Sequence, residues 1–280
     1  MTTRRARLRV PVAILFSVTI ASVGCAGSGS QPAPTAVAPL SSGPATDSTP
    51  DACAAVPGSA PIWLVVFQDK TGSANHTRTE QFSEEDLVRL LSLVCRGGGW
   101  LTFGLISDNS NDRLLRLTVE PPPPAPVPDA LPPNPLAAAD VGTRNHKAQY
   151  AYQSALKGWH DTADGNIGLF FEDAMALLQR PSDYPRTDVV QALMRGSLAL
   201  NEPTTGPEPH RWWVLASDGE DTVHRKGLPN VVPGRLLLVN GAGRTGILPA
   251  FNPLRFEAVS AAIDYLEHVE ARALRPASQQ

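Results

Sequence analysis

Residues 61–73 read PIWLVVFQDKTGS, and this stretch decides the class of fold. Its first seven residues, Pro61 to Phe67, are apolar without interruption, which is typical of a strand buried on both faces of a sheet. The polar residues that follow place Asp69, Thr71 and Ser73 at alternate positions. The stretch therefore predicts a central strand that ends in a polar loop at one edge of a parallel sheet.

Strands and helices alternate along the rest of the chain. A helix is predicted after Ser83, which forms a capping box with Asp86, and three glycines at 97–99 end it. Further strands are predicted at 100–106, 113–119, 211–216 and 235–239, and further helices at 136–178, 187–200 and 256–269. This order predicts an α/β fold with an open, mainly parallel, Rossmann-like sheet and helices on both faces. The segment 113–119 is expected to be an antiparallel edge strand, and no sixth strand is predicted after 235–239.

An insertion at about 121–180 interrupts the alternation. Residues 121–135 are dense in proline and predict a stiff, polyproline-like connector. The helical segment that follows is expected to break near Gly165 or Gly168, because glycine is unfavourable inside a helix.

The first 25 residues have the pattern of a secretory signal. Residues 2–9 carry four arginines and no acid, and Val10 to Val23 is almost wholly apolar. This run of about 14 residues is shorter than the ~20 that a helix needs to cross a membrane. The ending Val23-Gly24-Cys25 resembles a bacterial lipobox, in which the cysteine is lipidated. The resemblance implies an extracytoplasmic protein of the bacterial cell envelope, anchored to the cell membrane by a lipid on Cys25.

Composition divides the remainder of the chain. Residues 26–60 are mostly Ser, Ala, Pro, Gly and Thr, and a disordered tether is predicted there. The folded domain is expected to span 61–274, before a short tail at 275–280. The net charge of −3 argues against nucleic acid as a partner, because proteins that bind it usually carry a strong basic excess.

The chain has three cysteines, Cys25, Cys53 and Cys95. If Cys25 carries a lipid, the other two form an even pair in an oxidising compartment, where a disulfide is the default state. The alternative is two unrelated buried thiols, because the sequence does not give the distance between them.

Three loops at the carboxyl edge of the predicted sheet offer oxygen ligands. They contribute, in chain order, Asp69, Thr71 and Ser73, then Thr187, and then Asp218. Carboxylates and hydroxyls without His or Cys suit a hard cation such as Mg²⁺, with Mn²⁺ or Ca²⁺ as alternatives. Ligands in open parallel sheets bind at this same edge. The sequence therefore predicts a metal site there.

These motifs resemble those of the von Willebrand factor A domain and its metal-ion-dependent adhesion site. The family carries Asp-x-Ser/Thr-x-Ser after its first strand, as in residues 69–73, and a threonine ahead of a helix, as at Thr187. It also carries an aspartate after its fourth strand, as in Ser217-Asp218-Gly219. The resemblance implies that the metal takes a carboxylate from a partner protein, so that the chain is a binding module and not an enzyme.

Two other interpretations use the same residues. A haloacid-dehalogenase-like phosphatase would use Asp69 as its nucleophile, Ser107 as a phosphate contact and Asp218 as a Mg²⁺ ligand. It would also need a second acid where Thr71 stands. The other alternative is a sheet domain with a degenerate metal site, because an Asp or Ser after a strand often only caps the next helix.

Overall fold

The computed structural model describes residues 53–76, 79–110, 114–204, 206–223, 234–239 and 248–273, which belong to one compact unit over Asp47–Gln280. The predicted signal, most of the predicted tether and the tail lie outside the described residues. The elements in chain order are β1 (Ile62–Asp69), α1 (Gly72–His76), α2 (Glu84–Gly97), β2 (Gly99–Ile106), β3 (Leu115–Val119), α3 (Pro135–Leu178), α4 (Val189–Leu200), β4 (His210–Ala216), β5 (Arg235–Val239), a 3₁₀ helix (Leu248–Phe251), β6 (Leu254–Phe256) and α5 (Val259–Ala273).

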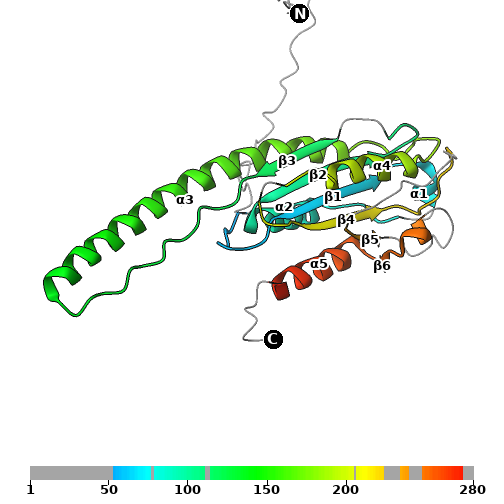
Figure 1. Ribbon diagram of the computed structural model, residues 1–280. Helices are drawn as coiled ribbons and strands as arrows, with labels where there is room; N and C mark the ends of the chain where they lie inside the picture. The colour runs from blue at the N-terminus through cyan, green and yellow to red at the C-terminus, as the bar shows by residue number, and fades with distance from the viewer. Residues whose placement is uncertain are drawn as a thin grey trace, which may run out of the picture. The chain divides into compact units, whose positions relative to one another are not determined.

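The six strands form one mixed sheet in the order β3-β2-β1-β4-β5-β6 (Figure 1). All neighbouring strands are parallel except β2 and β3, which pair antiparallel. The α/β class and the antiparallel edge strand are thus confirmed. The expectation of no sixth strand is wrong, because Leu254 in β6 pairs with Leu237 in β5. Three partly exposed residues carry too little periodicity to reveal a strand.

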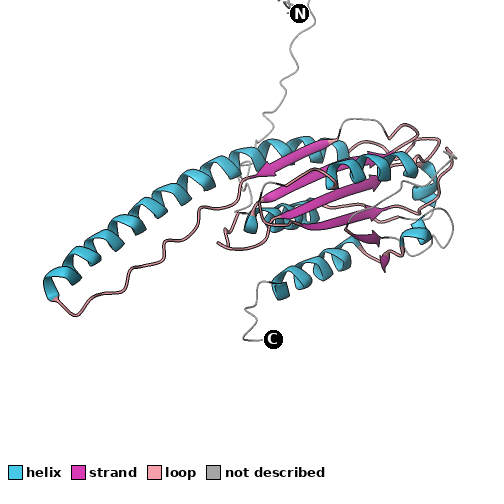
Figure 2. Cartoon of the chain, in the orientation of Figure 1, coloured by secondary structure: helices cyan, strands magenta, loops and turns pink. Residues whose placement is uncertain are grey.

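Helices cover both faces of the sheet (Figure 2). Side chains alternate along β1, so that Leu64 and Val66 pack on one face and Val65 and Phe67 on the other. The first face is covered by α2, α5 and the second half of α3, whereas α4 packs on the second face. Every residue of β1 is buried, as its uninterrupted apolar run predicts.

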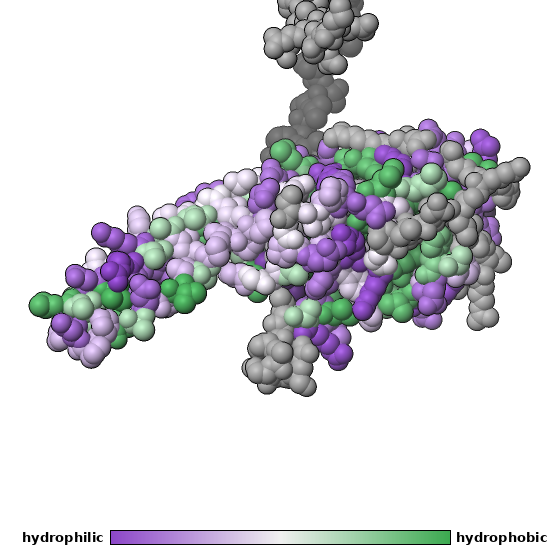
Figure 3. Space-filling model, in the orientation of Figure 1, coloured by the Kyte–Doolittle hydropathy of each residue, from purple (hydrophilic) through white to green (hydrophobic). Residues whose placement is uncertain are grey.

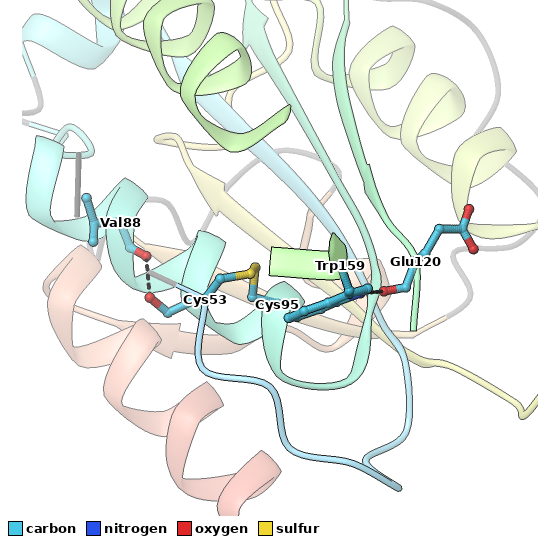
Figure 4. The surroundings of a disulfide bond; sticks show 6 residues. Cys53, Val88, Cys95, Glu120 and Trp159 are labelled. Carbon is cyan, nitrogen blue, oxygen red and sulfur yellow. Dashed lines mark hydrogen bonds between the residues drawn. A yellow bond between two sulfur atoms is a disulfide. The ribbon is translucent and has the colours of Figure 1, made fainter. Parts of the chain in front are cut away.

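A disulfide joins Cys53 to Cys95, confirming the predicted pair. It fixes the start of the described chain to the last turn of α2, and both cysteines are buried in the first core cluster. Trp159 of α3 lies in the surroundings of this bond, and its indole Nε1 donates to the Glu120 carbonyl over 2.7 Å (Figure 4).

The helix α3 runs unbroken from Pro135 to Leu178, so the predicted break near Gly165 or Gly168 is wrong. A Cβ at either glycine would meet nothing within 4 Å. The glycines therefore weaken the helix without bending it. A buried stripe at helical spacing runs past both glycines and packs the helix onto the sheet; it contains Ala163, Ile167, Phe170, Ala174, Leu177 and Leu178.

Substituting alanine for glycine is expected to change the free energy of unfolding in opposite directions at two helical positions. Gly165→Ala is expected to raise the free energy of unfolding by about 1 kcal/mol, because alanine is the better helix former and the site is open. Gly196→Ala in α4 is expected to lower it by about 2 kcal/mol, because the new Cβ would lie 2.3 Å from the ring of buried Trp213. Urea unfolding of both variants measures the difference. Equal effects would show that helix propensity, not packing, decides both positions.

The first half of α3 and the proline-rich segment form an arm over residues 121–158 (Figure 2). Pro122, Pro123, Pro126 and Pro132 are half-buried, and the Asp129 backbone exchanges two hydrogen bonds of 2.9 and 3.0 Å with the Asn145 side chain. The contacts at positions 123, 126, 129 and 132 repeat every three residues, which is the period of a polyproline helix, whose backbone forms no hydrogen bonds of its own. The proline-rich segment is extended, as predicted, and lies along α3.

No helix among the described residues combines the length and the apolar character needed to span a membrane.

Candidate functional site

The candidate site lies where β1, β2 and β4 end. Asp69 is the last residue of β1, opposite Ile106 of β2, and Gln68 is opposite Ala216 of β4. The parallel register therefore brings the loops after these three strands to one edge. The segment that precedes α4 joins them there, because the Asp188 N–H donates to the Ser107 carbonyl over 2.9 Å.

Three hydroxyl groups from two distant segments meet at this edge. Thr71 Oγ1 lies 3.1 Å from Ser73 Oγ and 3.1 Å from Thr187 Oγ1, and Ser73 Oγ lies 3.4 Å from Thr187 Oγ1. Thr187 is more than one hundred residues away in the sequence, so only the tertiary fold brings it here. The structure thus gathers three of the five residues that the sequence selects as oxygen ligands.

Asp69 is the buried carboxylate beside this hydroxyl cluster. Its Oδ1 accepts from the Thr71 N–H at 2.9 Å and from Thr71 Oγ1 at 2.7 Å, and its Oδ2 accepts from Ser217 Oγ at 2.6 Å. Burial raises the pKa of Asp69 to about 6, although these hydrogen bonds oppose the rise; the nearby Asp218 charge adds to it. The carboxylate is therefore held in position but lacks a compensating positive charge among the described residues.

Asp218 supplies the second carboxylate. Its Oδ1 accepts from the Glu220 N–H over 3.0 Å, whereas its Oδ2 is buried and has no hydrogen-bond partner among the described residues. A buried polar atom without a partner costs about 1–3 kcal/mol unless something else satisfies it. A bound cation would satisfy this oxygen and would also offset the repulsion between Asp69 and Asp218.

The surrounding residues fix the loops in place. The Lys70 Nζ donates to the Leu178 carbonyl over 2.7 Å and to the Gln81 side chain, which ties the end of α3 to the Asp69 loop. Gly72 N–H donates to the Tyr184 carbonyl over 2.9 Å. Asp221 Oδ1 accepts from the first N–H of α4, on Val189, over 2.9 Å.

Sequence reasoning selected none of Lys70, Ser217 and Asp221 as a site residue. Ser217 directly precedes Asp218 in the Ser217-Asp218-Gly219 motif, so its place in the sequence could have marked it as a site residue. Nothing in the sequence indicates that the Lys70 amine caps α3, because its partner is 108 residues away.

The donor set fits a hard cation better than a transition metal. The cluster holds two carboxylates and three hydroxyls, and no group of three His, Cys, Asp or Glu side chains suited to a metal occurs among the described residues. The orphaned Asp218 Oδ2 is the observation that favours a cation here. Hydroxyls are neutral ligands, so such an ion would keep affinity for a further anionic ligand.

The raised pKa of Asp69 predicts a pH-dependent stability in the absence of divalent cations. The folded pKa of about 6 exceeds the ordinary value of 3.8, so the contribution of this group is complete below pH 3.8 and is lost as the pH rises through 6. The loss is about 3 kcal/mol by pH 7. Urea unfolding at pH 4 and pH 7 in EDTA should show this loss in the wild type and not in Asp69→Asn. Parallel pH profiles for the two proteins would contradict the prediction.

The chain matches no protein-family model, no curated protein and no solved structure.

Proposed function

We propose that this chain is an extracytoplasmic, membrane-tethered binding module that holds a divalent cation and engages a protein partner through it. The cation is Mg²⁺, or Mn²⁺ or Ca²⁺, and its ligands come from Asp69, Thr71, Ser73, Thr187 and Asp218. The carboxylate of a partner protein completes its coordination. The fold proposed here is of the von Willebrand A type, and the membrane tether is a lipid on Cys25.

One observation carries the proposal: two buried carboxylates and three mutually close hydroxyls meet at a single sheet edge, and one carboxylate oxygen has no partner in the part of the chain that the structure describes. The two carboxylates supply the charged ligands for a divalent ion, and the neutral hydroxyls fill further positions without adding negative charge. An ion held in this way remains attractive to an incoming carboxylate.

The phosphatase alternative receives less support from the same contacts. Thr71 occupies the position of the required second acid, and its hydroxyl donates to Asp69 Oδ1. The nearby amine of Lys70 is engaged by the Leu178 carbonyl and the Gln81 side chain, so it is not directed at a substrate phosphate.

The test is a calorimetric titration of residues 47–280 with Mg²⁺ and with Mn²⁺. Wild type is expected to bind one ion, and Asp218→Ala to lose binding. Thr187→Val, which removes only the hydroxyl, is expected to bind about tenfold more weakly, the loss of about one charge-assisted contact. Asp183→Ala is the matched control, because it removes an exposed carboxylate from the segment between α3 and α4 without touching the cluster.

Saturable binding by wild type that persists in Asp218→Ala would place the ion elsewhere and refute the proposed site. No binding by wild type would leave a degenerate site. Turnover of a generic phosphate ester that depends on Asp69 would establish the phosphatase alternative instead.

A further inference from the structure

The free end of the arm carries exposed aliphatic side chains (Figure 3). Leu131 is 66% exposed and Leu136 81%. Val127, which is 90% exposed, lies farther back along the arm, because Asp129 pairs with Asn145 between it and the free end. The ten residues from 130 to 139 contain no charge, and the flanking Asp129 lies 3.7 Å from Arg144. Residues 130–139 are the arm tip. It is convex and apolar, unlike the charged surface that usually covers a soluble domain.

The backbone of the arm tip has few free hydrogen-bond donors. Pro132, Pro133 and Pro135 have no N–H group, and the N–H of Leu136 donates to the Asn134 side chain over 3.0 Å. The N–H of Ala138 donates to the Asn134 carbonyl over 2.8 Å. A helix start normally leaves four donors that water must satisfy. The arm tip can therefore leave water at a smaller cost than an ordinary loop of the same size.

The arm and the start of the described chain share one end of the sheet. The arm begins after Val119, the end of antiparallel β3, which pairs with Gly99 at the start of β2. Trp159 at the base of the arm lies near Cys53, the first described residue (Figure 4). The candidate cation site lies at the opposite edge, where β1 and β4 end. Figure 1 shows the arm extending away from that edge.

The lengths are compatible with a shared membrane. From Trp159 to Pro135 the helix rises about 36 Å. The 27 residues between Cys25 and Cys53 can span up to about 90 Å, and about 30 Å as a coil. A lipid on Cys25 and the arm tip can therefore reach one bilayer surface together.

We propose that the arm tip, through Leu131 and Leu136, inserts into the surface of the lipid bilayer to which the chain is tethered. The inference rests on the membrane tether of the proposed function. It directs the candidate cation site away from the bilayer, toward a partner. A neutral lipid surface suits the arm tip better than an anionic one, because its uncharged residues are bounded by Asp129 and Asp140.

The experiment uses residues 26–280 with a histidine tag ahead of Ala26, so that the whole tether is kept, captured on phosphatidylcholine vesicles that contain a nickel-chelating lipid. An environment-sensitive probe is attached at Ala139→Cys in the arm tip or, as the control, at Asp183→Cys near the cation edge. Both positions are exposed, whereas Cys53 and Cys95 are bonded to each other and buried. A lipid-bound quencher reports entry of the probe into the bilayer.

The probe at position 139 is expected to shift to shorter wavelength and to be quenched, and the probe at 183 is expected to do neither. Leu131→Ser/Leu136→Ser should lower the quenched fraction at 139 at least about tenfold, because burial of a leucine contributes about that factor or more. Both leucines are exposed, so the melting temperature should not change.

Equal signals at 139 and 183, or a signal at 139 that survives the double serine change, would overturn the proposal. A shift at 139 that grows with protein concentration in the absence of vesicles would overturn it in favour of a second copy of the chain. The Asp218→Ala background should leave the signal intact, which separates failure at the arm tip from failure at the cation site. Since the tag supplies the anchor, the result is also independent of Cys25.

Discussion

Replacing Asp69 by asparagine is expected to remove cation binding while making the domain more stable. Loss of one of the two carboxylate ligands should weaken Mg²⁺ binding at least about a hundredfold. Removing a residue that only hydrogen-bonds to a metal ligand already lowers metal affinity about 10–100-fold. At pH 7 the wild-type carboxylate is ionised, buried and without a positive partner among the described residues. Asparagine removes that cost and should raise the free energy of unfolding by about 2 kcal/mol in EDTA.

The asparagine amide fits the existing contacts. Its oxygen can accept from Thr71 as Asp69 Oδ1 does, and its NH₂ can donate to Ser217 Oγ, which lies 2.6 Å from Oδ2 in the wild type. Calorimetric titration and urea unfolding of the same preparation measure both effects. Asp183→Asn, at an exposed position, serves as the control and should change neither. A variant that binds Mg²⁺ as wild type does, or that is less stable than wild type in EDTA, would contradict the assignment of Asp69.

Removal of the disulfide is expected to have the largest effect on stability. Cys53 and Cys95 are separated by 42 residues. Without the bond the unfolded chain gains entropy, which by the chain-entropy relation lowers the free energy of unfolding by about 4 kcal/mol for a loop of that length. For a domain of this size the loss should lower the melting temperature by about 10 °C. Differential scanning calorimetry of wild type with and without a reducing agent measures it.

The double variant Cys53→Ala/Cys95→Ala provides the control, because reductant should not affect it. It should melt at or slightly below the temperature of the reduced wild type, since two buried sulfur atoms are also lost. If reduction moves the melting temperature of wild type by less than 2 °C, the bond does not constrain the unfolded chain as this relation assumes.

The sequence predicted the elements whose signals are local. The apolar run over β1 and the glycine stop after α2 are properties of a few adjacent residues. Gly165 and Gly168 gave a local break signal that was wrong, because Ala163, Ile167 and Phe170 on either side of them are buried against the sheet. Helix propensity is a weak local term, and tertiary packing outweighs it.

The candidate site was predictable for a different reason. Residues that follow parallel strands emerge at one edge whatever their separation in the chain, so Asp69 and Asp218 could be placed together from topology alone. The side-chain contacts that hold Asp69 and Asp218 in place could not be predicted from topology. Ser217 reaches Asp69, and Lys70 reaches Leu178, through side-chain packing across more than one hundred residues.

The length of α3 has an electrostatic consequence. The helix spans about 65 Å from Pro135 to Leu178. Its last carbonyl, on Leu178, accepts a hydrogen bond from Lys70, the residue after Asp69, so this end of the helix lies at the candidate cation site. The potential of a charged surface decays over about 8–10 Å in physiological salt. If the arm stands upright on a bilayer, the candidate cation site lies several such lengths beyond it. The site would then be exposed to the bulk concentration of divalent ions, and its occupancy would not follow the charge of the lipids below.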